Sequence, residues 1–190
     1  GSKNSLPGYL HFESIKYRAA VDVIGKHLSG ILVFKQDTTE NSIRVVFVNE
    51  MGVTFFDISF HDDHYLYHSI MESMDKKAVK ISLAKDLGMI LMRGIYKNEN
   101  NIGSRYKVSA DCKETFELKL KRKGRVQYPC MTSAASQNQI INLGKRKKVV
   151  SVMQFFNQEQ IDQHSLPDSI FVQHHTVNFT ISLKQLHATE

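Results

Sequence analysis

The sequence predicts a mainly β protein (α+β): a curved antiparallel half-barrel of about ten strands, with one principal helix covering its concave face. Between residues 10 and 71, apolar and polar side chains alternate with the two-residue period of strands, and turn signals recur at regular intervals. Between residues 75 and 94 the period changes to that of an amphipathic helix. Several strands have apolar residues on both faces, which favours a sheet covered on more than one side.

The size and composition of the chain are those of one globular domain, so residues 1–190 are expected to form a single unit. A chain of 190 residues can build one core, whereas two separate cores would be cramped. Hydrophobic residues make up 42% and charged residues 23%, which argues against disorder and against a fibrous repeat. No stretch approaches eighteen uncharged apolar residues, so no membrane-spanning helix is predicted.

The strands fall into two groups on either side of the helix. The first group is expected at residues 10 to 24, 27 to 36, 42 to 50, 53 to 60 and 64 to 71. The second group comprises the segments RYKVSA, ETFELKLKR, GRVQYPCM, QIINLG and KVVSVMQFF, and a final long strand that contains SIFVQHHTVNFTISL.

The helix is predicted from an apolar stripe, with Asp75 as its N-cap and Gly94 as its stop. The stripe consists of Val79, Leu83, Leu87, Ile90 and Leu91. The opposite side is expected to carry Lys76, Lys77, Lys80, Lys85 and Asp86. Gly88 costs about 1 kcal/mol relative to alanine inside a helix, which predicts a close approach or a break there.

The sequence offers no motif for catalysis, for a metal or for a cofactor. Of the nine histidines, only His61 and His64 lie across a tight turn from each other, and a polar turn explains them as well as a metal does. His174 and His175 should point to opposite faces of a strand. There is no GxSxG, HExxH, P-loop or GxGxxG pattern. We therefore expect a non-enzymatic protein without metal or cofactor.

The basic runs at residues 119 to 125 and 144 to 149 contribute to a net charge of +6. Solvated hairpin tips and contact with an anionic membrane surface both explain them. Nucleic acid is disfavoured as a partner, because the aromatic residues alternate like core residues. Cys112 and Cys130 are interpreted either as separate thiols or as a disulfide between neighbouring strands.

Residues 29 to 60, followed by a strand and the amphipathic helix, resemble the lipoprotein carrier and receptor family of LolA and LolB, and the receptor LolB more closely. The resemblance implies an incomplete barrel with a helical lid over an apolar space that accepts acyl chains of lipid or lipoprotein. It matches Met51 of NEMG to a protruding leucine of the receptor, although Glu50 stands where the receptor has proline. The implied location is the periplasmic side of the bacterial outer membrane, with anchoring through a lipidated cysteine.

We expect the ligand-binding residues to be apolar walls with Met51 at the mouth. The predicted walls are Phe34, Phe47, Phe56, Ile58, Phe60, Leu83, Leu87 and Leu91. Lys121, Arg122, Lys123 and Arg125 are expected to face lipid headgroups. Alternatives remain open for Met51 and for the function of the protein. Met51 can fold back beside Phe56, and the protein can be an interaction scaffold with a filled core; a hydrolase would require a titratable cluster inside the cavity.

Overall fold

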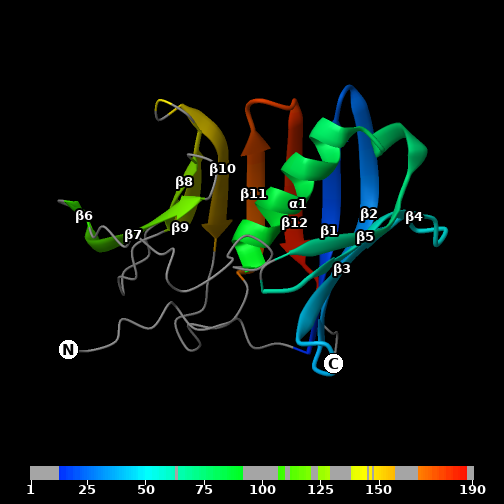
Figure 1. Cartoon of the computed structure of the whole chain (residues 1–190). Helices are drawn as coiled ribbons and strands as arrows, with labels where there is room; N and C mark the ends of the chain where they lie inside the picture. Colours follow the sequence, from blue (N-terminus) through cyan, green and yellow to red (C-terminus); the bar gives the residue numbers. More distant parts are fainter. Residues whose placement is uncertain are drawn as a thin grey trace.

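The computed structural model describes residues 13–62, 64–91, 107–109, 112–120, 124–128, 138–144, 146, 148–156 and 167–187. Within these residues there are twelve strands, a short 3-10 helix and one α-helix (Figure 1). The first five strands are β1 (Ser14–Val23), β2 (Lys26–Asp37), β3 (Ser42–Val48), β4 (Thr54–Phe60) and β5 (Tyr65–Ile70). The helices η1 (Glu72–Met74) and α1 (Lys77–Leu91) follow. The remaining strands are β6 (Lys107–Ser109), β7 (Cys112–Leu120), β8 (Gly124–Tyr128), β9 (Asn138–Leu143), β10 (Val149–Phe156), β11 (Ser169–His174) and β12 (Phe179–Gln185).

The strands form one antiparallel sheet in the order β5-β4-β3-β2-β1-β12-β11-β10-β9-β8-β7-β6. Consecutive strands are neighbours on each side of the sheet, and the first and last strands, β1 and β12, meet in the middle. Their register pairs Tyr17 with Gln185 and Val23 with Phe179. The sheet is therefore two meanders joined by the pairing of the two ends of the chain.

The predicted fold class is confirmed, but the strand count of about ten is too low. One cause is the C-terminal segment, which was expected to be a single long strand. The chain turns at residues 175–178, so that β11 and β12 form a hairpin in which His174 pairs with Phe179. As a result, His174 is buried at the end of a strand while His175 is exposed in the turn.

The helix is confirmed, although its start differs from the prediction. α1 begins at Lys77, and Asp75 instead ends η1, where its N–H donates to the Glu72 carbonyl at 3.1 Å. The five stripe residues are all buried, and the helix continues through Gly88 without a break. Asp86 was assigned to the polar side but is fully buried. Gly94 lies outside the described residues, and no helix within those residues has the length and apolar character needed to cross a membrane.

The contacts of α1 show how strongly the sheet curves. The Tyr67 hydroxyl of β5 donates to the Lys80 carbonyl at 2.8 Å, and Asp86 accepts from the Ser151 hydroxyl of β10 at 2.7 Å. β5 and β10 are seven strand positions apart, or about 34 Å along a flat sheet. Lys80 and Asp86 are only about 9 Å apart along a helix. The sheet must therefore bend around α1, as Figure 1 shows.

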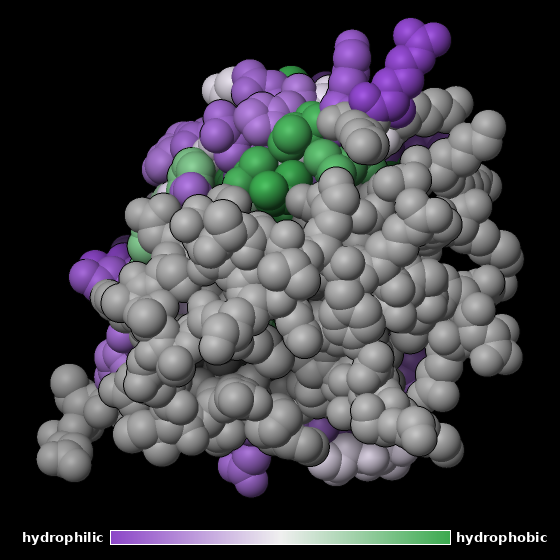
Figure 2. Space-filling model, turned by 90° about the vertical axis from the view of Figure 1, so that its left-hand side faces the viewer, coloured by the Kyte–Doolittle hydropathy of each residue, from purple (hydrophilic) through white to green (hydrophobic). Residues whose placement is uncertain are grey.

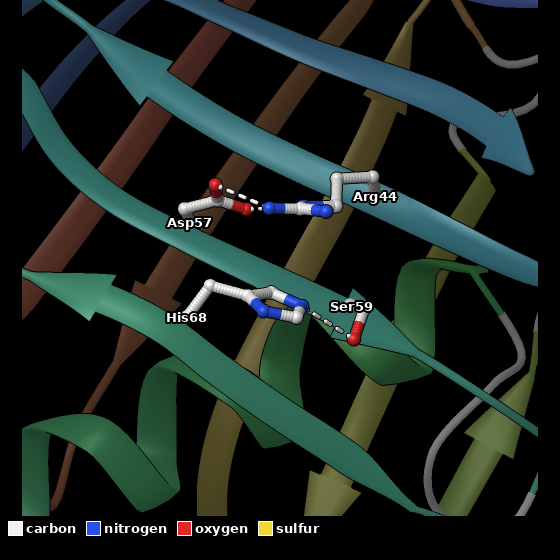
Figure 3. Close-up of polar contacts among 4 residues, drawn as sticks. All are labelled: Arg44, Asp57, Ser59 and His68. Carbon is white, nitrogen blue, oxygen red and sulfur yellow. Dashed lines mark hydrogen bonds and ion pairs between the residues drawn. The ribbon is translucent and has the colours of Figure 1, made fainter.

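The two faces of the sheet differ in chemistry. The face toward α1, called the inner face here, carries the buried apolar residues of successive strands. The opposite face carries polar pairs, which Figure 3 shows with α1 behind the strands. Arg44 donates to both oxygens of Asp57, at 2.6 and 2.8 Å, and His68 lies 2.9 Å from the Ser59 hydroxyl. The pKa of Arg44 is raised, mainly by its hydrogen bond to Asp57. On this outer face, the one turned away from α1, these contacts link β3 to β4 and β4 to β5.

Candidate ligand-binding site

The predicted wall residues lie together in the core between the inner face and α1. Phe34, Phe47, Phe56, Ile58, Phe60, Leu83, Leu87 and Leu91 are all buried, each with at most 2% of its surface exposed. Those on the strands are brought together by register, because Phe34 pairs with Val45, Phe47 with Phe56 and Ile43 with Phe60. The structure thus gathers the eight residues in one buried hydrophobic core.

Aromatic rings concentrate at one end of this interior. The ring of Phe47 lies 4.7 Å from that of Phe55 and 5.5 Å from that of Phe56, in tilted arrangements. Tyr17 meets Phe34 edge to face at 5.6 Å. Such pairs stabilise by about 0.5–1.5 kcal/mol beyond the area that they bury. These ring contacts therefore add to the stability of the core on β1 to β4.

Met51 lies at the tip of the β3–β4 hairpin and is 86% exposed. Its turn is built by Asn49, whose side-chain oxygen accepts from the backbone N–H groups of Met51 at 3.0 Å and Val53 at 2.8 Å. Gly52 closes the turn with a φ of 82°, a conformation that favours glycine. The methionine therefore projects from a fixed turn into solvent, and the alternative in which it folds back beside Phe56 is not the one observed. Val53, beside it, is 48% exposed.

Tyr67 ties the N-terminal half of α1 to the edge strand β5. Its hydroxyl donates to the Lys80 carbonyl, and the Lys80 ammonium lies 5.2 Å from the centre of its ring. Burial, followed by the proximity of Tyr65, raises the pKa of Tyr67 above that of a free phenol. The hydroxyl thus remains a donor to the helix over the physiological pH range.

Asp86 ties the C-terminal half of α1 to β10 and β11. One oxygen accepts from the Ser151 hydroxyl, and the other lies 2.7 Å from His174 Nδ1; both side chains are buried. The second ring nitrogen of His174 lies 2.8 Å from the Thr176 hydroxyl, and the ring stacks on Phe179 at 4.7 Å. Lys85 precedes Asp86 in the helix, and burial lowers the pKa of its ammonium while the charge of Asp86 opposes that shift. A carboxylate of α1 therefore holds two strands at once.

Asp86, Ser151, His174 and Thr176 form a cluster of the kind that a hydrolase would need. The hydrogen bonds among them therefore bear on whether the cluster can act in catalysis. A nucleophilic serine must hydrogen-bond to its base, yet the Ser151 hydroxyl donates to Asp86 and not to His174. The hydroxyl that does meet His174 belongs to Thr176, two residues away in the same turn. Through Asp86 the cluster joins the helix to the sheet.

Sequence reasoning missed the polar residues of the inner face, although two of them carried a signal. His174 follows Ile170 and Val172 at two-residue spacing, which places it on their face. Ser151 shares the face of Met153 in the same way. Asp86 gave a weaker signal, because its position three residues after Leu83 lies only at the border of the apolar stripe.

Other predicted sites receive little support or lie outside the described residues. The rings of His61 and His64 stack at 4.4 Å, but the described residues contain no group of three or more side chains suited to a metal. Lys121, Arg122, Lys123 and Cys130 are outside the described residues. Arg125 and Cys112 are placed on strands β8 and β7 by their backbone.

The described surface shows where apolar side chains reach the exterior. In Figure 2, a small group of hydrophobic side chains is visible near the top of the molecule, with hydrophilic side chains above it. Among the large hydrophobic side chains of the described residues, Met51 is the most exposed. Apolar surface is thus available outside the buried interior.

Comparison with solved structures identifies a similar fold. A candidate outer membrane lipoprotein-sorting protein domain from Vibrio parahaemolyticus superposes with a TM-score of 0.54 at 7% identity, covering 92% of this chain and 84% of that chain. A DUF1329 family protein from Desulfovibrio piger ATCC 29098 gives a TM-score of 0.49 at 10% identity, with the same coverage. No protein-family model matches the sequence. No curated protein sequence matches it either.

The fold of this chain, a curved antiparallel sheet with a helix on its concave face, is therefore similar to that of the Vibrio lipoprotein-sorting domain. At such low identity the likeness concerns the fold alone. The closer resemblance to LolB remains a prediction from residues 29 to 60.

Proposed function

We propose that this protein binds the acyl chains of a lipid or lipoprotein on the inner face of its sheet, beneath α1, without catalysing a reaction. The observation that carries the proposal is the arrangement of one helix over an apolar, strongly curved face. The fold shared with a lipoprotein-sorting domain supports it. The corresponding location is the periplasmic side of the bacterial outer membrane, with a lipid anchor and a net charge of +6 that favours anionic headgroups.

The energetics allow α1 to act as a movable cover. Its polar contacts to the sheet are the Tyr67 bond, which contributes about 1 kcal/mol, and two bonds to the Asp86 carboxylate at about 1.5–3 kcal/mol each. Each buried methylene of an acyl chain contributes about 0.8 kcal/mol. About five to nine methylenes therefore offset the loss of these anchors, and the rest of the chain replaces the apolar contacts that the helix gives up.

Met51 is proposed to make the first contact with a membrane or with lipidated cargo. Methionine is unbranched and polarisable, and so adapts to irregular apolar partners. Its position at the tip of a hairpin held by Asn49 lets it contact another surface without disturbing the core.

The variant Met51→Glu tests this role. We expect it to receive fluorescent lipid from vesicles at least about tenfold more slowly than the parent, because a carboxylate does not enter an apolar phase. Its unfolding free energy should change by less than about 0.5 kcal/mol, since the side chain is 86% exposed. Met51→Leu is the control and should transfer like the parent. If Met51→Glu transfers lipid as fast as Met51→Leu, the hairpin tip has no such role.

A second candidate function is an interaction scaffold with the same fold and a filled core. The near-complete burial of all eight predicted wall residues favours it. The two functions differ in one observable property, because a carrier retains lipid during purification under native conditions and a scaffold does not.

A further inference from the structure

A row of polar side chains crosses the inner face of the sheet beside the C-terminal half of α1. Register places Asn142 of β9 opposite Ser151 of β10, and Ser151 opposite His174 of β11. Directly paired residues share a face of the sheet, and both Ser151 and His174 contact Asp86 of α1. Asn142 therefore also faces the interior beneath the helix. We call Asn142, Ser151 and His174 the inner polar row.

Asn142 differs from the other members of the row in its hydrogen bonding. Its side chain is completely buried, and in the part of the chain that the structure describes neither its Nδ2 nor its Oδ1 has a hydrogen-bond partner. Buried polar groups in folded proteins nearly always have a partner. A buried amide with both ends unsatisfied is a cost in the protein alone, and a ligand that offers complementary polar atoms would remove it.

The chemistry of the row restricts what such a ligand can be. The Asn142 amide offers donors on Nδ2 and an acceptor on Oδ1. A head group with an N–H or O–H beside a carbonyl satisfies both atoms at once. A carboxylate or phosphate head supplies only acceptors, and it would approach Asp86, whose oxygens already accept hydrogen bonds from the row. An uncharged head group is therefore favoured at this position.

We propose that Asn142 binds the uncharged polar head of an acyl ligand, through one donated and one accepted hydrogen bond, while the acyl chain lies beneath α1. This inference rests on the proposed function and names the class of its ligand. The required pairing of a donor with a carbonyl occurs both in monoacylglycerols and in N-acyl amides.

The test uses the full chain and four probes that share one sixteen-carbon acyl chain. 1-Palmitoylglycerol and N-palmitoylethanolamine offer a donor beside a carbonyl, methyl palmitate offers a carbonyl without a donor, and palmitate carries a charge. Affinities are measured by displacement of a fluorescent fatty-acid analogue. We expect one or both of the donor-bearing probes to bind about tenfold more tightly than methyl palmitate, which corresponds to one additional net hydrogen bond. Their relative order distinguishes a glycerol head from an amide head.

The variant Asn142→Leu is expected to abolish this preference. It replaces both unsatisfied atoms by methyl groups on a side chain with the same number of heavy atoms, and the removed desolvation penalty offsets the cost of the larger volume, so its thermal stability should stay close to that of the parent. It should bind the three uncharged probes with similar affinities, because it loses two hydrogen bonds to each donor-bearing probe but only one, from Nδ2 to the carbonyl, to methyl palmitate. Asn178→Leu, in the exposed β11–β12 turn, is the control and should keep the preference.

Each other outcome is decisive. Equal binding of 1-palmitoylglycerol, N-palmitoylethanolamine and methyl palmitate by the parent overturns the inference but leaves acyl binding intact, as does the tightest binding of palmitate. A preference that persists in Asn142→Leu removes the role from Asn142. Failure of all four probes to bind overturns the proposed function together with the inference. The comparison of probes on the parent decides the question even where the variant does not fold.

Discussion

Replacing Asp86 by alanine should lower the free energy of unfolding by about 3–5 kcal/mol, as measured by urea denaturation. The substitution removes both acceptors from a buried site, so that the Ser151 hydroxyl and His174 Nδ1 lose their partner while staying out of water. It also detaches α1 from β10 and β11. Few single substitutions in a domain of this size cost as much.

The chain contains a matched control for this experiment. Asp22 lies 2.7 Å from His27 Nδ1, the same distance that separates Asp86 from His174, but the Asp22 and His27 side chains are 61% and 63% exposed. Asp22→Ala should therefore change the unfolding free energy by no more than about 1 kcal/mol. Equal effects of Asp86→Ala and Asp22→Ala would show that the buried junction does not hold the helix.

Leu87→Ala should lower the unfolding free energy by about 3 kcal/mol, because truncation of a fully buried leucine adds a cavity to the lost transfer energy. Leu66→Ala is the control, since Leu66 is 50% exposed on β5 and its truncation should cost less than about 1 kcal/mol. The measurement is again urea denaturation, with and without an acyl probe.

The effect of the probe separates the two candidate functions. In a carrier, an acyl chain beneath α1 fills the space vacated at Leu87, so saturating probe should stabilise Leu87→Ala at least as much as the parent. In a scaffold with a filled core the acyl chain cannot enter, so the probe should not change the unfolding free energy of either protein. If the probe stabilises neither protein, Leu87 contributes to the stability of the core and not to acyl binding.

The sequence predicted the regular part of the fold well because that part obeys simple periods. Alternation located β1 to β5, and the apolar stripe located α1, including Val79 and Leu91 at its two ends. The turn between β11 and β12 was missed because HHTVN lacks the glycine or proline that usually marks a hairpin. A run of β-formers on both sides then reads as one strand.

Of the residues that the structure brings together around α1, the sequence pointed only to the apolar ones. The wall residues follow from periodicity, and Met51 from its place between two strands. The polar junction depends on which strands meet beneath α1, and Asp86 lies 65 residues from Ser151 and 88 from His174. Such contacts are set by the closure of the sheet, which local patterns do not encode. The position of Asn142 beside Ser151 likewise depends on strand pairing that local sequence patterns do not reveal.

The most direct test of acyl binding is native mass spectrometry of the protein, expressed in the periplasm of a bacterium that has an outer membrane and purified without lipid-exchanging detergent. We predict a complex whose added mass equals that of an intact acyl lipid, released on denaturation and chemically unchanged. Protein that carries no lipid and also fails to take up fluorescent lipid would contradict the account, and recovery of hydrolysed lipid would contradict its non-enzymatic character.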